Sequence, residues 1–336
     1  MRCTDLHVDS APNPPVTPTL LASGPNGELA TRALEAPWSA YATAQLDAPP
    51  VAIRSHDGNF YVVHADAIQI LALDLTTIDT IALPGADARD IAFVGTHTAI
   101  VSQRARTSLA RIDLHTRTVT QIDLSPLANA SGLATEMLAS CGAQVFVQLR
   151  RDQAPALAVL DVTDTCESIV GLVALVHPPA FKMETNCAAA ELYVAEPVPL
   201  FEGAGAYQRV DLTSLTATTQ PYADGLGELG GFVMRARDDG WFITHTEFGP
   251  SPSSHLQQIT PSSQTAAWNS FAPAHIDRLA LDLPTSQLFF PDSCFAHCTD
   301  GFAPGIQVFD AATGAHLSAT GAIEVGFPPV DVVVAR

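Results

Sequence analysis

Short apolar segments separated by turn residues recur along the whole chain, and they decide which fold we expect. Residues 91–94 and 99–101 form one such pair, and residues 279–281 and 287–290 form another. Segments of this length, rich in β-branched and aromatic residues and bounded by turn formers, are typical of β-strands. No amphipathic segment of twelve or more residues stands out between them. The pattern therefore predicts an all-β chain of short, paired strands.

A strand that runs into a tight acidic turn recurs at a regular interval. Residues 308–314 give the clearest copy, in which Asp310 offers a side-chain acceptor to the turn and Gly314 tolerates a positive φ. The equivalent positions are residues 74, 113, 161, 211, 260 and 310, at spacings of 39, 48, 50, 49 and 50. A period in this range, built from strands, is the signature of a propeller blade.

The repeat predicts a single all-β domain over residues 1–336, a seven-bladed β-propeller of four-stranded antiparallel blades. Six blades follow in order, at residues 49–86, 87–130, 131–176, 177–226, 227–273 and 274–325. The seventh combines residues 326–336 with residues 4–48, so that the C-terminal strand pairs with N-terminal strands. Closing the ring in this way removes exposed sheet edges. An open six-bladed ring with loose ends is the alternative.

The last repeat resembles the YVTN-type propeller repeat. Residues 305–314 supply a strand, an Asp and a Thr-Gly turn, and residues 326–330 supply the Gly-x-x-Pro that leads into the next inner strand. Three or four other units match in part, and the tetrapeptide Tyr-Val-Thr-Asn itself is absent. The resemblance implies a propeller fold that is frequent in secreted and cell-surface proteins. It implies no catalytic residue, because the repeat of that family is structural.

The charge of the chain excludes some classes of partner. Thirty-five acidic residues against 16 basic ones give a formal net charge of −19, and Lys182 is the only lysine. Nucleic-acid binding and docking on anionic lipid both need a basic face, so neither is expected. No run of about 18 apolar residues occurs, so no transmembrane helix is expected. The acidity favours solubility, and alternatively supplies an acidic face for cations or a basic partner.

Six cysteines are candidates for disulfides, at positions 3, 141, 166, 187, 294 and 298. Cys294 and Cys298 lie in one polar loop, where a short disulfide would pin the loop and indicate an oxidising compartment. The alternative there is a metal site of Cys294, His297 and Cys298 with a fourth ligand from elsewhere.

The other four cysteines lie near predicted turns. Cys141 and Cys187 occupy equivalent turns of neighbouring blades, and Cys166 lies in a turn on the same side of the ring. We therefore expect the pairs Cys166–Cys187 and Cys3–Cys141, although sequence alone does not determine connectivity.

Cysteine content and the resemblance favour an extracytoplasmic location, which means periplasmic, cell-surface or secreted. The N-terminal residues show no charged region followed by an apolar core of about seven to fifteen residues, so no signal peptide is visible. Residues 12–18 are proline-rich and predict an extended connector.

Long loops gather on one side of the predicted ring, late in the chain, at residues 196–206, 245–255 and 291–305. Long loops on a rigid scaffold are where binding function concentrates, so we expect the partner surface there. His245 and Glu247 stand two residues apart at the end of a strand and point to the same side. With Asp292 or His297 of the next blade they form a candidate binding site for metal or acid–base chemistry. The alternative is that all four are solvated loop residues.

The sequence contains no Gly-x-Ser-x-Gly elbow, phosphate-binding loop, His-Glu-x-x-His pair or EF-hand loop, so no catalytic residue is assigned. The leading hypothesis is a non-enzymatic extracytoplasmic propeller that binds a protein, or assembles with copies of itself, through the long loops of the later blades. The second is a lactonase-type hydrolase with His and carboxylates at the channel mouth. The third is a metal- or redox-carrying module using the loop from Cys294 to Cys298. No cofactor is expected, except a divalent cation in the second case.

Overall fold

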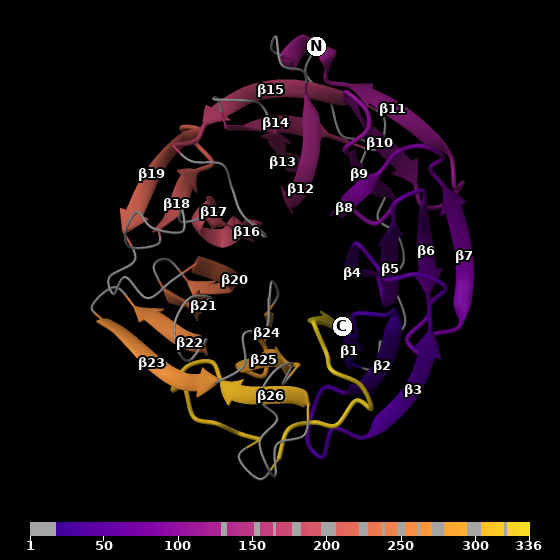
Figure 1. The fold of residues 1–336 in the computed structure, drawn as a ribbon. Helices are drawn as coiled ribbons and strands as arrows, with labels where there is room; N and C mark the ends of the chain where they lie inside the picture. Colours follow the sequence, from indigo (N-terminus) through magenta and orange to yellow (C-terminus); the bar gives the residue numbers. More distant parts are fainter. Residues whose placement is uncertain are drawn as a thin grey trace.

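Seven antiparallel sheets stand in a ring around an open centre in the computed structural model of the chain (Figure 1). Each sheet runs outward from an inner strand at the centre to an outer strand at the rim. The ring confirms the predicted all-β, seven-bladed propeller. The structure describes residues 18–128, 133–150, 155–163, 166–176, 183–195, 206–221, 228–236, 239–246, 253–260, 263–270, 279–293, 304–318 and 321–336.

The first three blades along the chain have four strands each, numbered from the centre outward. Blade 1 consists of β4 (Ala52–His56), β5 (Asn59–His64), β6 (Ala67–Leu71) and β7 (Thr77–Ala82). Blade 2 consists of β8 (Ala88–Val94), β9 (Thr98–Gln103), β10 (Ser108–Asp113) and β11 (Val119–Asp123). Blade 3 consists of β12 (Ala134–Cys141), β13 (Gln144–Arg150), β14 (Ala156–Val162) and β15 (Glu167–Ala174).

The next three blades continue the ring in the same order. Blade 4 consists of β16 (Met183–Asn186), β17 (Glu191–Ala195), β18 (Ala206–Asp211) and β19 (Thr216–Pro221). Blade 5 consists of β20 (Glu228–Ala236), β21 (Asp239–Thr246), β22 (Ser253–Thr260) and β23 (Ser263–Ser270). The described residues of blade 6 form β24 (Ala280–Asp282), β25 (Gln287–Asp292) and β26 (Gly305–Asp310).

The helical elements of the described chain are two short 3₁₀ turns, η1 (Ser125–Leu127) and η2 (Cys187–Ala189). Neither turn is long and apolar enough to cross a membrane.

The closing blade joins the two ends of the chain, as predicted. Its innermost strand is the C-terminal β27 (Asp331–Ala335), and β1 (Thr19–Ser23), β2 (Glu28–Ala33) and β3 (Ala40–Gln45) follow outward. β27 pairs antiparallel with β1, so that Val333 stands opposite Leu21. This pairing gives β27 a partner on its outer edge and β1 a partner on its inner edge.

The antiparallel order places the connections of each blade on two sides of the ring. The turns from first to second strand and from third to fourth strand lie on one side, which we call the turn face. The connections from second to third strand and from one blade to the next lie on the other side, which we call the loop face. Because β27 is an inner strand, its C-terminal end and the start of β1 both lie on the turn face.

The repeated aspartates shape the turns between third and fourth strands. The Asp310 carboxylate accepts hydrogen bonds from the backbone amides of Ala312 (3.0 Å) and Thr313 (2.7 Å). Asp113 and Asp211 accept in the same way from the amides two and three residues further along. These side-chain acceptors satisfy amides that would otherwise be unpaired in the turn. The role predicted for the repeated aspartate is confirmed.

The same turns require a left-handed backbone four residues after the aspartate. Gly314 takes a φ of 73°, as predicted. At the equivalent positions Arg117 and Leu215 take φ values of 62° and 54°. A side chain with a Cβ atom is strained in this region, so two blades accept a cost that the last repeat avoids with glycine.

Apolar side chains fill the space between neighbouring blades. All six residues of β9 are buried, since both faces of this middle strand meet another blade. Ala99 and Val101 belong to the cluster shared with blade 1, whereas Ile100 belongs to the cluster shared with blade 3. The alternation follows from the two-residue period of a strand. The core is therefore a series of layers between sheets.

An ion pair joins blade 6 to the closing blade on the turn face. Arg336 Nε and Nη2 donate to Asp282 Oδ1 and Oδ2, each at 2.5 Å, and Thr285 also donates to this carboxylate. Burial raises the pKa of the Asp282 carboxyl, but the hydrogen bonds from Arg336 and Thr285 outweigh that effect and hold the pKa below its usual value. The last inner strand is thus fastened to its neighbour by a bidentate charged contact.

A disulfide between Cys141 and Cys187 joins blade 3 to blade 4, with the two Cα atoms 5.4 Å apart. The predicted pairs Cys166–Cys187 and Cys3–Cys141 are therefore wrong. Cys141 ends β12 and Cys187 follows β16, so the equivalent turns of neighbouring blades meet directly across the joint. Cys166 is also disulfide-bonded. Cys3, Cys294 and Cys298 lie outside the described residues.

Candidate functional site

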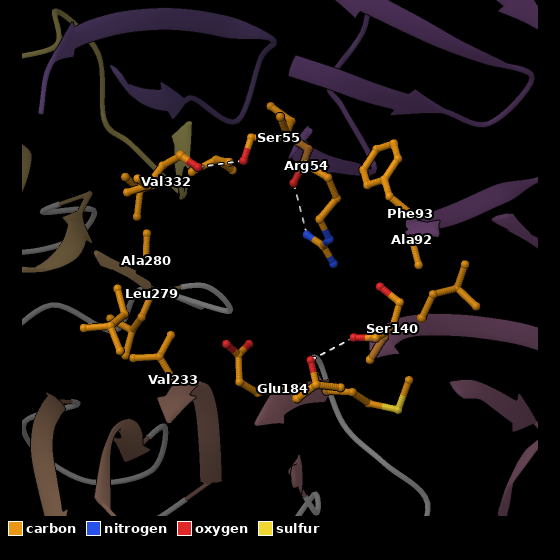
Figure 2. A pocket seen from close by; sticks show the side chains of 18 of the residues that line it. Arg54, Ser55, Ala92, Phe93, Ser140, Glu184, Val233, Leu279, Ala280 and Val332 are labelled. Carbon is orange, nitrogen blue, oxygen red and sulfur yellow. Dashed lines mark hydrogen bonds between the residues drawn. The ribbon is translucent and has the colours of Figure 1, made fainter. Parts of the chain in front are cut away.

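The inner strands of all seven blades surround a central cavity of about 410 Å³ (Figure 2). Residues of β4, β8, β12, β16, β20, β24 and β27, or directly beside these strands, line it. Seven radial sheets do not meet at the ring axis, so a propeller of this size leaves a channel there. The inner strands contribute charged, hydroxyl and apolar side chains to the channel wall.

A charged pair forms the wall at blades 1 and 2. Arg54 Nη2 donates to Asp90, with contacts of 2.8 and 2.9 Å to its two carboxylate oxygens. Asp90 is buried, and its carboxylate also accepts hydrogen bonds from the amides of Ile91 (2.9 Å) and Leu138 (3.0 Å). Three blades therefore converge on one carboxylate, which holds the Arg54 guanidinium in the channel wall.

Two carboxylates line the channel itself. Glu184 lies on β16, and Figure 2 shows its carboxylate pointing into the centre from a different side than Arg54. Asp331 begins β27, and its Oδ1 accepts a hydrogen bond from the amide of Val332 at 2.8 Å. The described lining therefore carries the carboxylates of Glu184 and Asp331 and the guanidinium of Arg54, which is paired with the buried Asp90.

Hydroxyl groups in the channel wall connect neighbouring inner strands. Ser55 Oγ donates to the carbonyl of Val334 at 2.6 Å, which ties blade 1 to the closing blade. Thr185 Oγ1 donates to the carbonyl of Ser140 at 3.0 Å, which ties blade 4 to blade 3 (Figure 2). Each hydroxyl donates its proton to a backbone carbonyl of the neighbouring blade, so both hold adjacent inner strands together. Neither hydroxyl has a His or carboxylate hydrogen-bond partner among these contacts that would activate it as a nucleophile.

The opposite part of the wall is apolar. Val233 of blade 5, Leu279 and Ala280 of blade 6 and Val332 of the closing blade line the channel there (Figure 2). Ligand pockets typically combine an apolar lining with a few placed polar groups. The channel offers that combination, because the charged groups of Arg54, Glu184 and Asp331 stand among apolar lining residues.

The residues predicted as a binding site are mostly beyond the described part. Glu247 and His297 lie outside the described residues, and for His245 the structure describes only its place in β21. Asp292 ends β25, is 3% exposed, and lies 3.4 Å from the Gln307 amide that donates to it. The joint role of these four residues in binding stays a prediction.

Sequence reasoning missed the charged residues of the channel. Arg54, Asp90 and Glu184 lie within inner strands, and each has one apolar and one polar neighbour in the sequence. A charge inside an inner strand of a propeller was the available signal. The pairing of Arg54 with Asp90 depends on how two blades align, which no local pattern shows.

We searched the described residues for side chains that could bind a metal ion together and for histidines in the channel wall. No group of three or more His, Cys, Asp or Glu side chains there is placed to hold a metal ion. The described lining residues of the channel include no histidine. The described lining of the channel therefore offers carboxylates without a histidine beside them.

Comparison with known proteins supports the fold alone. No family model matches the chain, and no curated protein matches it by sequence. A candidate 6-phosphogluconolactonase from Bacteroides fragilis matches with a TM-score of 0.65 at 13% identity, over 96% of this chain and 100% of that one. The ring is a seven-bladed β-propeller. A protein from Lactobacillus plantarum matches this propeller with a TM-score of 0.64 at 11% identity, over 95% of this chain and 99% of the other. BamB from Moraxella catarrhalis matches it with a TM-score of 0.51 at 11% identity, over 81% and 78%.

Proposed function

We propose that this propeller is a non-enzymatic binding protein whose central channel takes a basic group. That group is either a small organic amine or guanidine, or the Lys or Arg side chain of a partner protein. The observation that carries the proposal is the carboxylate of Glu184, which points into a central channel with apolar side chains in its wall (Figure 2).

The channel suits an organic cation better than a bare metal ion. An ammonium or guanidinium group forms charge-assisted hydrogen bonds with carboxylates such as Glu184 and Asp331. Its carbon stem would pack against Val233, Leu279 and Val332, which also line the channel. The described residues contain no group of three or more His, Cys, Asp or Glu side chains placed to hold a metal ion. The net charge of −19 would further raise the local concentration of cations.

The protein acts, in this proposal, in an extracytoplasmic and oxidising compartment. Disulfides persist in such compartments and are rare in the cytosol. Cys141, Cys187 and Cys166 are all disulfide-bonded. Three of the six cysteines of the chain thus support this location.

Binding to a protein surface is a second candidate function, and the outer strand β15 favours it. Ile169, Val170 and Leu172 on this strand are 36%, 48% and 43% exposed, and Val176 just beyond it is 61% exposed. Outer strands β11 and β19 carry mainly Thr, Asp and Gln instead, and β7 has one exposed large apolar residue, Ile78. Proteins normally blunt open sheet edges with charges, so an apolar edge indicates an interaction site. The long loops of the later blades, outside the described residues, remain the surface expected from sequence.

The channel proposal is tested by calorimetric binding of agmatine and of a tetralysine peptide to wild type and Glu184→Gln. We expect binding of at least one probe, weakened at high salt. The substitution should raise Kd by about ten- to hundredfold, since a hydrogen bond to a charged group contributes about 1.5–3 kcal/mol. Asp47→Asn removes the same charge at an exposed site outside the channel and should leave Kd unchanged.

Agmatine binding alone would identify a small-molecule ligand, and tetralysine binding alone would identify a protein side chain. Absence of binding by both probes, or equal binding by Glu184→Gln, would overturn the channel proposal. Hydrolysis of a gluconolactone above the uncatalysed rate would overturn the non-enzymatic assignment and restore the hydrolase hypothesis.

The β15 candidate is tested by sedimentation of Val170→Lys and of Ile78→Lys. Ile78 is 50% exposed on outer strand β7 and serves as the matched control. If copies of the chain associate through β15, Val170→Lys should shift the assembly to monomer and Ile78→Lys should not. A monomeric wild type, or equal behaviour of the two variants, excludes self-association through this edge.

A further inference from the structure

Each inner strand contributes one residue to the channel wall at an equivalent register. This residue stands opposite the third residue of the second strand of its blade, as Arg54 does with Tyr61 and Glu184 with Tyr193. The other five blades place apolar residues at this position, namely Ala92, Ala139, Val233, Ala280 and Val333. All seven residues line the central cavity. We call this set of seven residues the channel layer.

The two charged residues of the channel layer stand on opposite sides of the ring. Arg54 belongs to blade 1 and Glu184 to blade 4, with two blades between them in one direction and three in the other. Figure 2 shows both side chains pointing toward the middle of the channel. The described contacts of Arg54 are with Asp90 and with the carbonyl of Ile53, so Arg54 is not paired with Glu184. Two opposite charges are therefore held apart across one cavity.

The guanidinium of Arg54 is held in place and can still bind an anion. Its Nη1 donates to the carbonyl of Ile53 at 3.1 Å, and its Nη2 donates to the buried Asp90. A guanidinium has five N–H groups, so these contacts use only part of its donors. Because Asp90 orients the group in advance, a ligand would not have to order it on binding. A carboxylate in the channel would accept charge-assisted hydrogen bonds from the remaining N–H groups.

The apolar members of the channel layer leave room for a short carbon chain between the two charges. Three of them are alanines, whose side chains end at Cβ, and the other two are valines. The cavity of about 410 Å³ is within the range of about 300–1,000 Å³ that is usual for small-molecule sites. Methylene groups placed between the charges would leave water and contact apolar side chains, which favours binding.

We propose that the channel binds a dipolar organic molecule that has a carboxylate at one end, an ammonium or guanidinium group at the other, and a short aliphatic chain between them. The carboxylate binds Arg54, the cationic group binds Glu184, and the chain packs on the apolar members of the channel layer. This inference rests on the proposed function and narrows its ligand to an ω-amino or ω-guanidino acid. A simple amine, or the side chain of a partner protein, would leave the remaining donors of Arg54 unused.

Calorimetric titration of the wild-type chain tests the proposal directly. The probes are 4-aminobutanoate, 6-aminohexanoate and 8-aminooctanoate, each compared with its own terminal amide, which keeps the length and the ammonium group but lacks the negative charge. We expect one length to bind most tightly, and at that length the acid should bind about tenfold more tightly than the amide. Equal binding of acid and amide at every length would overturn the inference. The proposed function would then still stand if agmatine binds and Glu184→Gln weakens its binding.

A double variant tests the carboxylate end of the ligand. Arg54→Gln/Asp90→Asn replaces the ion pair by two amides and should abolish the preference for the acid over the amide. The control Arg89→Gln/Asp87→Asn removes an ion pair of the same residue types, with a contact of 3.0 Å, that lies outside the described lining, and it should keep the preference. A folded Arg54→Gln/Asp90→Asn variant that keeps the preference would overturn the inference. If this variant does not fold, the comparison of acid and amide on wild type still decides.

The variant Glu184→Gln tests the cationic end of the ligand. It should weaken binding of the acid and of its amide by the same factor, because both carry the ammonium group that binds Glu184, so the preference for the acid should remain. An acid that binds wild type and Glu184→Gln with equal Kd would overturn both this inference and the proposed function. Binding of agmatine without binding of any of the three acids would overturn this inference alone.

Discussion

Two joints of the ring use the same positions with different chemistry. At the joint of blades 3 and 4, Cys141 ends one inner strand and bonds to Cys187, the first residue after the next inner strand. At the joint of blade 6 and the closing blade, Asp282 ends one inner strand and pairs with Arg336, the first residue after β27. One contact is covalent, and the other is a bidentate ion pair.

The difference between the joints follows from chain connectivity. Blades 3 and 4 are consecutive in sequence, so the disulfide reinforces a joint that the chain already holds. The closing blade depends on the pairing of β27 with β1, because its innermost strand comes from the other end of the chain. We therefore expect that disrupting the apolar packing of the closing strand costs more stability than loss of the disulfide, whereas loss of the single ion pair costs less.

The largest effect is expected from a charge placed in the closing strand. Val332 is 3% exposed and packs in the cluster shared by blade 6 and the closing blade. Val332→Asp buries an unpaired carboxylate and should cost more than about 4 kcal/mol of unfolding free energy. Denaturant unfolding followed by tryptophan fluorescence measures it. The control Leu317→Asp, at a site that is 44% exposed, should cost less than about 1 kcal/mol.

Removing the disulfide should have the next largest effect. Cys141 and Cys187 are 46 residues apart, and loop entropy for such a separation predicts a loss of about 4 kcal/mol in Cys141→Ser/Cys187→Ser. Unfolding free energies with and without reductant measure the loss. If this variant is less stable than Val332→Asp, the order of the two joints proposed above is wrong.

The ion pair should give the closing joint a pH dependence that the disulfide lacks. The folded pKa of Asp282 is lowered, so its contribution is full above the ordinary carboxyl pKa of about 4 and is lost as pH falls through the folded value. At neutral pH Arg336→Ala should cost about 2 kcal/mol, less than for a fully buried pair because the guanidinium is 36% exposed.

The measurement is the unfolding free energy of wild type and Arg336→Ala from pH 7 to pH 2. The gap between the two proteins should narrow below pH about 4 as Asp282 takes up its proton. A gap that stays constant over this range would show that Arg336 acts by packing and not by charge.

The smallest effect is expected at the turn beside Asp282. Ser286 takes a φ of 54°, in the left-handed region that favours glycine. Ser286→Gly should raise the unfolding free energy by about 0.5–1 kcal/mol by removing this strain. The reverse change at a matched position, Gly314→Ala, should lower it by about 1 kcal/mol. A loss of stability in Ser286→Gly would mean that the Ser286 side chain contributes more than its backbone costs.

Features that depend on local chemistry could be predicted from the sequence. Asp310 and Gly314 signal a turn because the acceptor and the left-handed backbone lie within five residues of chain. The unpaired apolar strand near the C-terminus predicted the closure, since a buried strand needs a partner. Arg117 and Leu215 take the same left-handed conformation at the position equivalent to Gly314, but neither residue type predicts it. The fold of the blade imposes this backbone conformation although a residue with a Cβ atom disfavours it.

The sequence by itself determined the strand pattern, the blade repeat and the need to join the two ends, because each follows from periodicity or from short-range turn chemistry. Only the tertiary structure decided which cysteines meet, that Arg54 pairs with Asp90, and that Arg336 reaches Asp282. Those contacts join residues of different blades. They depend on the rotation and height of one sheet relative to the next, which is set by how side chains pack between the blades and is not encoded by any local pattern.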